Sequence, residues 1–443
     1  MFLERFFHLR EAGTTVRLEV LGGITTFMTM SYIVFLNPAI LAQTGMNFGA
    51  VMTATCLSAA AATLLMGFLA NYPIALAPGM GENIFFLTAV LGMGITWQQG
   101  LGAVFVAGIV FLILNLFNVR QVIIDAVPES LKHAIAAGIG LFIVFMGLVN
   151  AGIVVRHPME QAVPVHLGEL NNPAVWVSLL GLVLTGALLV RKVRGAILWG
   201  ILSTAVLGLI FRVAHYQGLV APPPSLAPTF LKMDIAGLLT WGMIPIILIF
   251  LYMDVLDSIG TFIGVGERMG LLKNGRLERG TRALTTDAAG TVIGACLGTS
   301  TVTAFIESSA GAAAGARTGL ANLVTALLFL AALFFSPVAQ MIGGGYAWKE
   351  GVLLYPVTAP ALIVVGTFMA ASLRRIPWDD FGEAIPALLI VVGIPLTYSI
   401  AEGLALGFIS YPVIKLLGGK GREVNRLCYL LGAIFLARYL FLD

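Results

Sequence analysis

The stretch Gly298–Gly319, GTSTVTAFIESSAGAAAGARTG, decides the fold class because it places a carboxylic acid, Glu307, in a segment broken by glycine, serine and threonine. A second stretch, Tyr252–Gly264 (YMDVLDSIGTFIG), carries two more acids, Asp254 and Asp257, in a mainly apolar run. A charged side chain near the centre of a bilayer costs at least ~2.5–3.5 kcal/mol, so such a residue usually has a function there. Acids in interrupted apolar segments therefore predict a polar site at membrane depth, as in a transporter.

The composition identifies an integral membrane protein. The chain is 59% hydrophobic and 11% charged, with a mean hydropathy of +0.97, whereas soluble domains have about 45–50% apolar and about 25% charged residues. Cys56, Cys296 and Cys428 stand singly in apolar segments without metal-ligand spacing, so we expect core residues and no metal or other cofactor. The first residues, MFLERFFHLREAG, carry charges throughout and do not resemble a cleavable signal peptide.

Apolar runs long enough to cross the hydrocarbon, about 17–25 residues each, follow one another along the chain. They predict an all-α polytopic membrane protein with about fourteen transmembrane segments and no soluble domain. A further apolar piece, residues 427–442, is short for a span and is expected on the surface or packed against the bundle. The expected spans are residues 20–40, 49–70, 74–92, 98–117, 131–151, 173–190, 195–212, 240–264, 284–297, 299–312, 318–336, 352–372, 383–398 and 400–417.

Basic residues test this count, because cytoplasmic loops of membrane proteins are enriched in Lys and Arg. With the N-terminus inside, 20 of the 25 Lys and Arg residues fall in cytoplasmic loops and ends. A miscount by one span would move many of these residues to the outer side and remove the bias, so we predict an even number of spans with both termini cytoplasmic. The 20 residues are Arg5, Arg10, Arg17, Arg120, Lys132, Arg191, Lys192, Arg194, Arg268, Lys273, Arg276, Arg279, Arg282, Arg317, Arg374, Arg375, Lys415, Lys420, Arg422 and Arg426.

A proline-rich loop at residues 221–228 (APPPSLAP) divides the chain near its midpoint into halves of seven expected spans. Because seven is odd, two such halves must lie in opposite orientations. The third span, with APGMGENIFF, and its counterpart the tenth, with TSTVTAFIES, are both interrupted, and we expect short extended stretches there. Paired broken segments at matching positions indicate a midplane binding site in an inverted-repeat transporter.

The run Ala77–Phe86 combines Pro and Gly residues, including Gly81, with the polar pair Glu82 and Asn83. Irregular backbone at membrane depth is tolerated only where protein or a water-filled cavity satisfies it. Asn83 offers a donor and an acceptor, which suits the edge of a heterocycle, although a helix kink used for packing would leave the same pattern. Glu82 either faces the cavity or caps the helix start.

Each acid of the eighth and tenth spans could have either a functional or a structural role. Asp254 and Asp257 are spaced i, i+3 on one helix face, and two such carboxylates with little water do not both ionise easily. One of them could carry a proton, or could hold neighbouring broken helices together. Glu307 would lie at a helix N-terminus, where its carboxylate could accept two N–H groups of a planar ligand or serve as a cap alone. Asp287 and Arg317 are expected to be structural.

Five stretches together resemble the nucleobase transporter superfamily, specifically its AzgA-like purine permeases for hypoxanthine, adenine and guanine. They are, in order, Gly22–Pro38 (GGITTFMTMSYIVFLNP), the APGMG run, DVLDSIGTFIGV, TSTVTAFIESSAG with ARTGL, and Gly407–Gly421 (GFISYPVIKLLGGKG). The resemblance runs from about Arg17 to Gly421. It implies an elevator-type proton symporter with fourteen spans in two inverted repeats of seven, often dimeric through a gate domain.

The resemblance also implies a division into two domains. A substrate-carrying core would comprise residues 1–118 (segments 1–4) and 240–337 (segments 8–11). A gate would comprise residues 119–239 (segments 5–7) and 338–443 (segments 12–14 and the apolar tail), and a homodimer would form through it.

Matching the family position by position implies a set of site residues. Phe85, Phe86 or Phe305 could stack on a base, although aromatics at such spacing usually pack. Backbone at Gly81 and the Thr301–Phe305 stretch would complete the pocket. The implied substrate contacts are Asn83, Asp254 with support from Asp257, Glu307, Gly81, Thr303 and Phe305. From the acids themselves, the candidate proton-coupling residues are Asp257, Asp254 and Glu82.

Two departures from the family pattern lie at this expected pocket. The usual residues after APGMG are an apolar residue and Asn-Ala, whereas this chain has Glu82-Asn83-Ile84, and Leu256 stands where many members have an aromatic. The identity of the transported base therefore stays open among guanine, hypoxanthine, adenine, xanthine and uracil.

We therefore expect proton-coupled uptake of a purine base across the cytoplasmic membrane, by a protein whose partners are the base, the proton and the bilayer. Nucleic-acid binding and enzymatic activity are not expected, and sodium coupling stays open. An anion exchanger of the same architecture would need positive potential at the site, where the sequence places acids. An intramembrane prenyltransferase would need a second acidic cluster and basic residues for a diphosphate, and the sequence offers neither.

Overall fold

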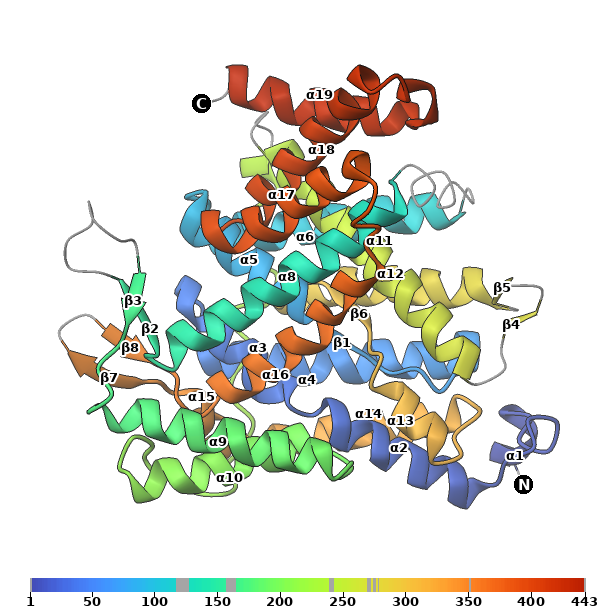
Figure 1. Cartoon of the computed structure of the whole chain (residues 1–443). Coiled ribbons are helices and arrows are strands. Elements are labelled where there is room, and N and C mark those ends of the chain that lie inside the picture. Colours follow the sequence, from blue (N-terminus) through green and yellow to red (C-terminus); the bar gives the residue numbers. More distant parts are fainter. Residues whose placement is uncertain are drawn as a thin grey trace.

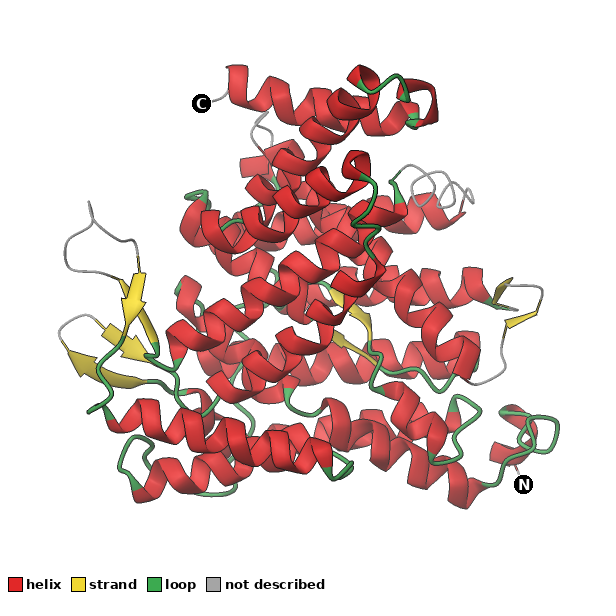
Figure 2. Cartoon of the chain, viewed as in Figure 1, coloured by secondary structure: helices red, strands yellow, loops and turns green. Residues whose placement is uncertain are grey.

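The computed structural model describes residues 2–116, 127–156, 165–238, 243–268, 272–273, 276–277, 279–349 and 352–441. Helices make up most of this part of the chain (Figure 2). The helices are α1 (Phe2–Phe6), α2 (Val16–Met30), α3 (Ile33–Leu41), α4 (Phe48–Leu65), α5 (Met80–Gly92), α6 (Trp97–Leu116), α8 (Glu129–Asn150), α9 (Pro173–Val190), α10 (Ala196–Ile210), α11 (Met243–Arg268), α12 (Gly280–Leu297), α13 (Ser308–Ala313), α14 (Leu320–Ala332), α15 (Ser336–Gly343), α16 (Ala359–Ala370), α17 (Phe381–Thr397), α18 (Ile400–Leu417) and α19 (Arg426–Phe441).

Each of the fourteen expected spans overlaps at least one of these helices. Seven helical segments of the described chain are long and apolar enough to cross a membrane, so the protein is a multi-pass membrane protein; the count of fourteen crossings stays a prediction. Residue 117 of the fourth expected span, Arg120, residues 240–242 of the eighth and residue 442 of the tail lie outside the described residues. The seven segments are Val16–Thr44, Phe48–Ala70, Trp97–Leu116, Glu129–Asn150, Pro173–Val190, Leu320–Gly343 and Ile400–Leu417.

Short antiparallel strand pairs mark the two ends of the molecule. Hairpins β2–β3 (Val154–Arg156 and Val165–Leu167) and β7–β8 (Tyr346–Lys349 and Val352–Leu354) lie at one end, and hairpin β4–β5 (Leu272–Lys273 and Arg276–Leu277) lies with α1 at the other (Figure 1). The distribution of Lys and Arg predicts that the first two hairpins lie outside the cell and the third in the cytoplasm. Their placement at opposite ends of the molecule agrees with that prediction. Which end faces the cytoplasm stays a prediction.

A fourth strand pair lies in the centre of the molecule, surrounded by helices (Figure 1). Strand β1 (Leu76–Pro78) pairs antiparallel with β6 (Val302–Ala304), with Ala77 opposite Thr303, and all six residues are buried. The strands come from the two halves of the chain and precede α5 and α13, as the interrupted third and tenth spans predicted. The extended stretches are therefore confirmed, and each half contributes one strand to the crossing.

The irregular backbone that leads into β1 is satisfied by buried side chains, as membrane depth requires. The hydroxyl of Thr63 on α4 accepts a hydrogen bond from the amide of Leu76 at 2.9 Å. The side-chain amide of Asn322 on α14 donates to the carbonyl oxygens of Thr63, Tyr72 and Ile74 at 3.2, 3.0 and 2.9 Å. A single buried amide therefore connects α14 to the segment before β1.

Replacing Asn322 with Leu is expected to lower the stability of the protein. The near-isosteric apolar side chain removes the amide that donates to these three carbonyl oxygens, at a cost of about 1–3 kcal/mol. The measurement is thermal unfolding of the purified protein in detergent. Asn115 is also buried, and within the described part of the chain its amide donates to the carbonyl of Leu284 alone. Asn115→Leu is therefore the matched control and should cost less; equal losses in the two variants would contradict this role for Asn322.

Candidate functional site

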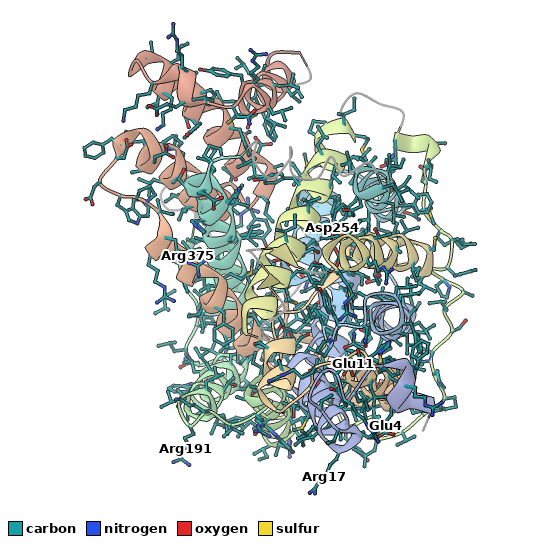
Figure 3. All side chains as sticks on the ribbon, turned by 90° about the vertical axis from the view of Figure 1, so that its right-hand side faces the viewer. Glu4, Glu11, Arg17, Arg191, Asp254 and Arg375 are labelled. Atoms are coloured by element: carbon teal, nitrogen blue, oxygen red, sulfur yellow. The ribbon has the colours of Figure 1, made fainter. Side chains whose placement is uncertain are left out.

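Helix α11 carries Asp254 and Asp257 one turn apart, as predicted, but the two side chains have different surroundings. Asp254 is 1% exposed, and its Oδ2 accepts a hydrogen bond from the Thr291 hydroxyl of α12 at 2.9 Å. Its Oδ1 is buried and has no hydrogen-bond partner among the described residues. Figure 3 shows Asp254 among helices in the interior, whereas Arg17 and Arg191 lie at the periphery. Asp257 is exposed, and at membrane depth an exposed acid is expected to face protein or water rather than lipid.

Buried hydroxyls link α11 to α12 and to the central strand β6. The Ser258 hydroxyl donates a short hydrogen bond to Oδ2 of Asp287 on α12. The same hydroxyl lies 2.7 Å from that of Thr303, which is opposite Ala77 in the β1–β6 pair. With Ser258 donating to Asp287, the Thr303 hydroxyl donates to Ser258. Asp287 thus has the structural contacts expected of it, and Thr303 has its hydroxyl in this network.

Helix α5 places Glu82 and Asn83 directly after β1. Glu82 is 1% exposed and its Oε2 lacks a hydrogen-bond partner within the described part of the chain. A Cβ at Gly79 would lie 2.1 Å from this oxygen and 2.6 Å from Cγ2 of Thr303, so only glycine leaves room for the carboxylate. Asn83 is fully buried, and its Oδ1 accepts a short hydrogen bond from the Ser300 hydroxyl. Among the described residues, its Nδ2 has the Met80 sulfur, at 3.9 Å, as its one hydrogen-bond acceptor.

Gly81 lies where α5 approaches α8 of the expected gate and α11 of the expected core. A Cβ there would meet Cγ2 of Ile139 on α8 at 3.4 Å and Cε of Met253 on α11 at 3.5 Å, which are ordinary contact distances. Phe85 packs edge-on against Phe250, with ring centroids 4.6 Å apart. The aromatic rings of α5 therefore pack against α11, as aromatic residues at this spacing usually do.

Glu307 directly precedes α13, so the expected position at a helix N-terminus is confirmed. Its side chain makes no capping hydrogen bond, which argues against a cap alone. Instead, the hydroxyl of Tyr32 donates to Oε1 at 2.6 Å, and the Glu307 side chain is half-buried. Phe305 is 5% exposed, with its ring centroid 6.3 Å from that of Tyr32.

The β1–β6 crossing brings these acids from three segments into one region. Glu82 is near enough to Asp254 and Asp257 for their charges to interact, and Asp257 is near enough to Glu307. Among the described residues no Lys or Arg forms an ion pair with any of these four carboxylates, and no group of His, Cys, Asp and Glu could hold a metal ion. The site therefore attracts protons and hydrogen-bond donors and repels anions.

Three residues of this region were not singled out from the sequence: Tyr32, Ser258 and Thr291. Tyr32 lies in the two-residue break between α2 and α3, within the stretch SYIVFLNP. The polar Ser-Tyr pair inside an apolar run is the sequence signal from which its position could have been inferred.

The comparison with known families follows from this arrangement. A model of the permease family matches residues 17–406. The chain belongs to the permease family. Membership makes the protein a transporter rather than an enzyme, and the resemblance to purine permeases noted above is confirmed.

Two relatives and one solved structure show how this permease compares. It is 43% identical over 443 residues to the adenine permease AdeP of Escherichia coli K12, covering 100% of this chain and 96% of that protein. It is 44% identical over 453 residues to the guanine/hypoxanthine permease PbuG of Bacillus subtilis 168, covering 99% and 100%. The transmembrane domain of a cyanobacterium bicarbonate transporter, BicA, is similar in structure with a TM-score of 0.59 at 13% identity, covering 88% of the permease and 97% of that chain. The last similarity concerns the fold alone.

Proposed function

We propose that this permease takes up purine nucleobases, with guanine, hypoxanthine and adenine as candidates, by proton symport. The observation that carries the proposal is the half-buried Glu307 carboxylate, which lies beside the β1–β6 crossing without a cationic partner among the described residues. An ionised carboxylate with a free oxygen accepts N–H groups strongly, and every purine base carries N–H groups. The names of the relatives AdeP and PbuG, at over 40% identity, support this substrate class.

The substrate contacts proposed are Glu307, Asn83 and an acid of α11, with Gly81, Thr303 and Phe305 around them. Glu307 would accept N–H groups of the base, and Phe305 would contribute an apolar wall. Asn83 would read the other edge through Nδ2, because its Oδ1 already accepts from Ser300. Between the α11 acids, the exposed Asp257 is the better candidate for direct contact, since Asp254 is buried against Thr291.

Proton coupling is proposed for Asp257, Asp254 and Glu82. Three carboxylates in mutual electrostatic range, of which Glu82 and Asp254 are buried, cannot all be ionised at little cost, so a proton shared among them is favoured. A coupling group must also reach water during the transport cycle, and the exposed Asp257 is the member that does so here.

The transport mechanism proposed is an elevator movement of a core (residues 1–118 and 240–337) against a gate (119–239 and 338–443). The antiparallel β1–β6 pair, with one strand from each half, supports two inverted repeats of seven segments each. We further propose fourteen crossings, both termini in the cytoplasm, insertion in the cytoplasmic membrane and a homodimer formed through the gate.

Transport of anions by the same fold is the alternative that the similarity to BicA raises. An anion site at membrane depth needs positive potential, from basic side chains or helix N-termini. Here four carboxylates meet without a basic partner in the described chain, so the anion alternative is disfavoured.

Uptake into proteoliposomes tests the proposal. Labelled guanine, hypoxanthine, adenine, xanthine and uracil are supplied with an inward proton gradient, an inward sodium gradient, or neither. We expect accumulation of one or more purines only with the proton gradient. Accumulation driven by sodium alone would contradict the coupling, and no accumulation of any base by folded protein would contradict the substrate class.

A further inference from the structure

We propose that Tyr32 is a positioning residue of the base-binding site, which holds the Glu307 carboxylate and determines how many N–H groups it can accept. The proposal rests on the proposed function, because it assigns a role within the same site. Its first observation is that Tyr32 and Glu307 are 275 residues apart in sequence, yet the phenol donates to Oε1 at 2.6 Å.

The position of Tyr32 makes this contact rigid. Tyr32 lies in the break between α2 and α3, and its side chain is 2% exposed. The adjacent segment also reaches Glu307, because the Thr29 hydroxyl lies 3.4 Å from its backbone carbonyl oxygen. The ring of Tyr32 lies near Phe305, tilted by 44°. The phenol therefore approaches the carboxylate from a fixed direction.

Tyr32 is also the one side-chain donor that the described residues provide to the Glu307 carboxylate. The carboxylate of Asp257, which interacts with Glu307 through its charge, is repulsive. A carboxylate held by a single donor at one oxygen has its rotamer fixed while the other oxygen stays open. Oε2 is therefore the atom left to receive an N–H of the base.

This division of the two oxygens has a consequence for specificity. Guanine presents two adjacent N–H donors, at N1 and the 2-amino group, whereas hypoxanthine presents only N1–H on that edge. With the phenol on Oε1, the second guanine N–H must share an oxygen that already accepts a hydrogen bond. Removing the phenol frees Oε1, so guanine should recover part of the loss and hypoxanthine should not.

Tyr32→Phe, which deletes only the hydroxyl, tests the assignment in proteoliposomes made with the full chain. We expect KM for hypoxanthine to rise about tenfold, as loss of one hydrogen bond to a charged group implies, with Vmax changed less than threefold. KM for guanine should rise less. The matched control is Tyr411→Phe, because the Tyr411 phenol also donates to a carboxylate, Oε1 of Glu383 at 3.1 Å, outside the site.

The outcomes separate this inference from the proposed function. If wild-type protein takes up no purine, the proposed function fails and so does this inference that rests on it. If wild-type protein transports purines and Tyr32→Phe keeps KM for hypoxanthine within twofold, the positioning role is overturned while the function stands. If Tyr411→Phe raises KM for hypoxanthine by the same factor, the rise is a general effect of phenol loss and the positioning role is overturned. If Tyr32→Phe raises KM equally for hypoxanthine and guanine, the role in specificity is overturned.

Discussion

Replacing Glu307 with Gln is expected to reduce purine uptake by about 100-fold or more, or to re-order the preference among bases, while the protein stays folded. Hydrogen bonds to a charged group contribute about 1.5–3 kcal/mol each, and each 1.4 kcal/mol is about tenfold in affinity. Glutamine keeps the volume and one carbonyl oxygen, which can still accept the Tyr32 hydroxyl. Its NH₂ group, however, would face an N–H group of the base, and two donors cannot form a hydrogen bond with each other. Vmax/KM for each labelled base is the quantity to measure.

Glu19→Gln is the matched control for this substitution. Glu19 is a buried carboxylate of α2 that accepts the backbone N–H groups of Arg317, Thr318 and Ala321. Its loss should lower the unfolding temperature and leave KM unchanged, the reverse of the pattern at Glu307. Uptake of every tested base at the wild-type rate by Glu307→Gln would remove Glu307 from the site.

The helices and the central strands were predictable because their signals are local. A helix overlaps each apolar run that hydropathy marked as a span, and Pro, Gly and hydroxyl residues located the breaks that became β1 and β6. The structural position of Glu307 before α13 followed from the same break. Each of these inferences needs only residues close together in the sequence.

The surroundings of the side chains were not predictable in this way. The i, i+3 spacing places Asp254 and Asp257 on neighbouring parts of α11, but only the packing of α12 buries the first and leaves the second exposed. Asn83 was expected to offer a free acceptor, yet Ser300, 217 residues away in sequence, donates to that oxygen. The Tyr32–Glu307 contact spans a similar separation. Such contacts depend on how the two halves of the chain pack against each other, and no pattern of neighbouring residues in the sequence predicts that packing.

Replacing Asp257 with Asn is expected to abolish accumulation of base against its gradient and to retain exchange of base across the membrane. Asparagine cannot take up or release a proton, so a carrier that needs Asp257 for coupling loses the link between the proton gradient and the substrate. Exchange of labelled for unlabelled base needs only movement of the loaded carrier, which the nearly isosteric side chain should permit. The measurement is uptake with and without an inward proton gradient, set beside counterflow in the same vesicles.

The difference in exposure between the two α11 acids makes this prediction specific. Asp254→Asn keeps an oxygen that can accept the Thr291 hydroxyl, and its burial removes it from direct exchange with water, so we expect a smaller loss of accumulation than at Asp257. Asp379 is an exposed acid in the loop before α17. Asp379→Asn therefore controls for the loss of one negative charge, and the variant should transport like the wild type. Proton-driven accumulation at the wild-type level in Asp257→Asn would exclude it as the coupling group. A coupling group has to meet water and substrate in turn, and in this structure Asp257 is the acid of the α11 pair whose exposure allows both.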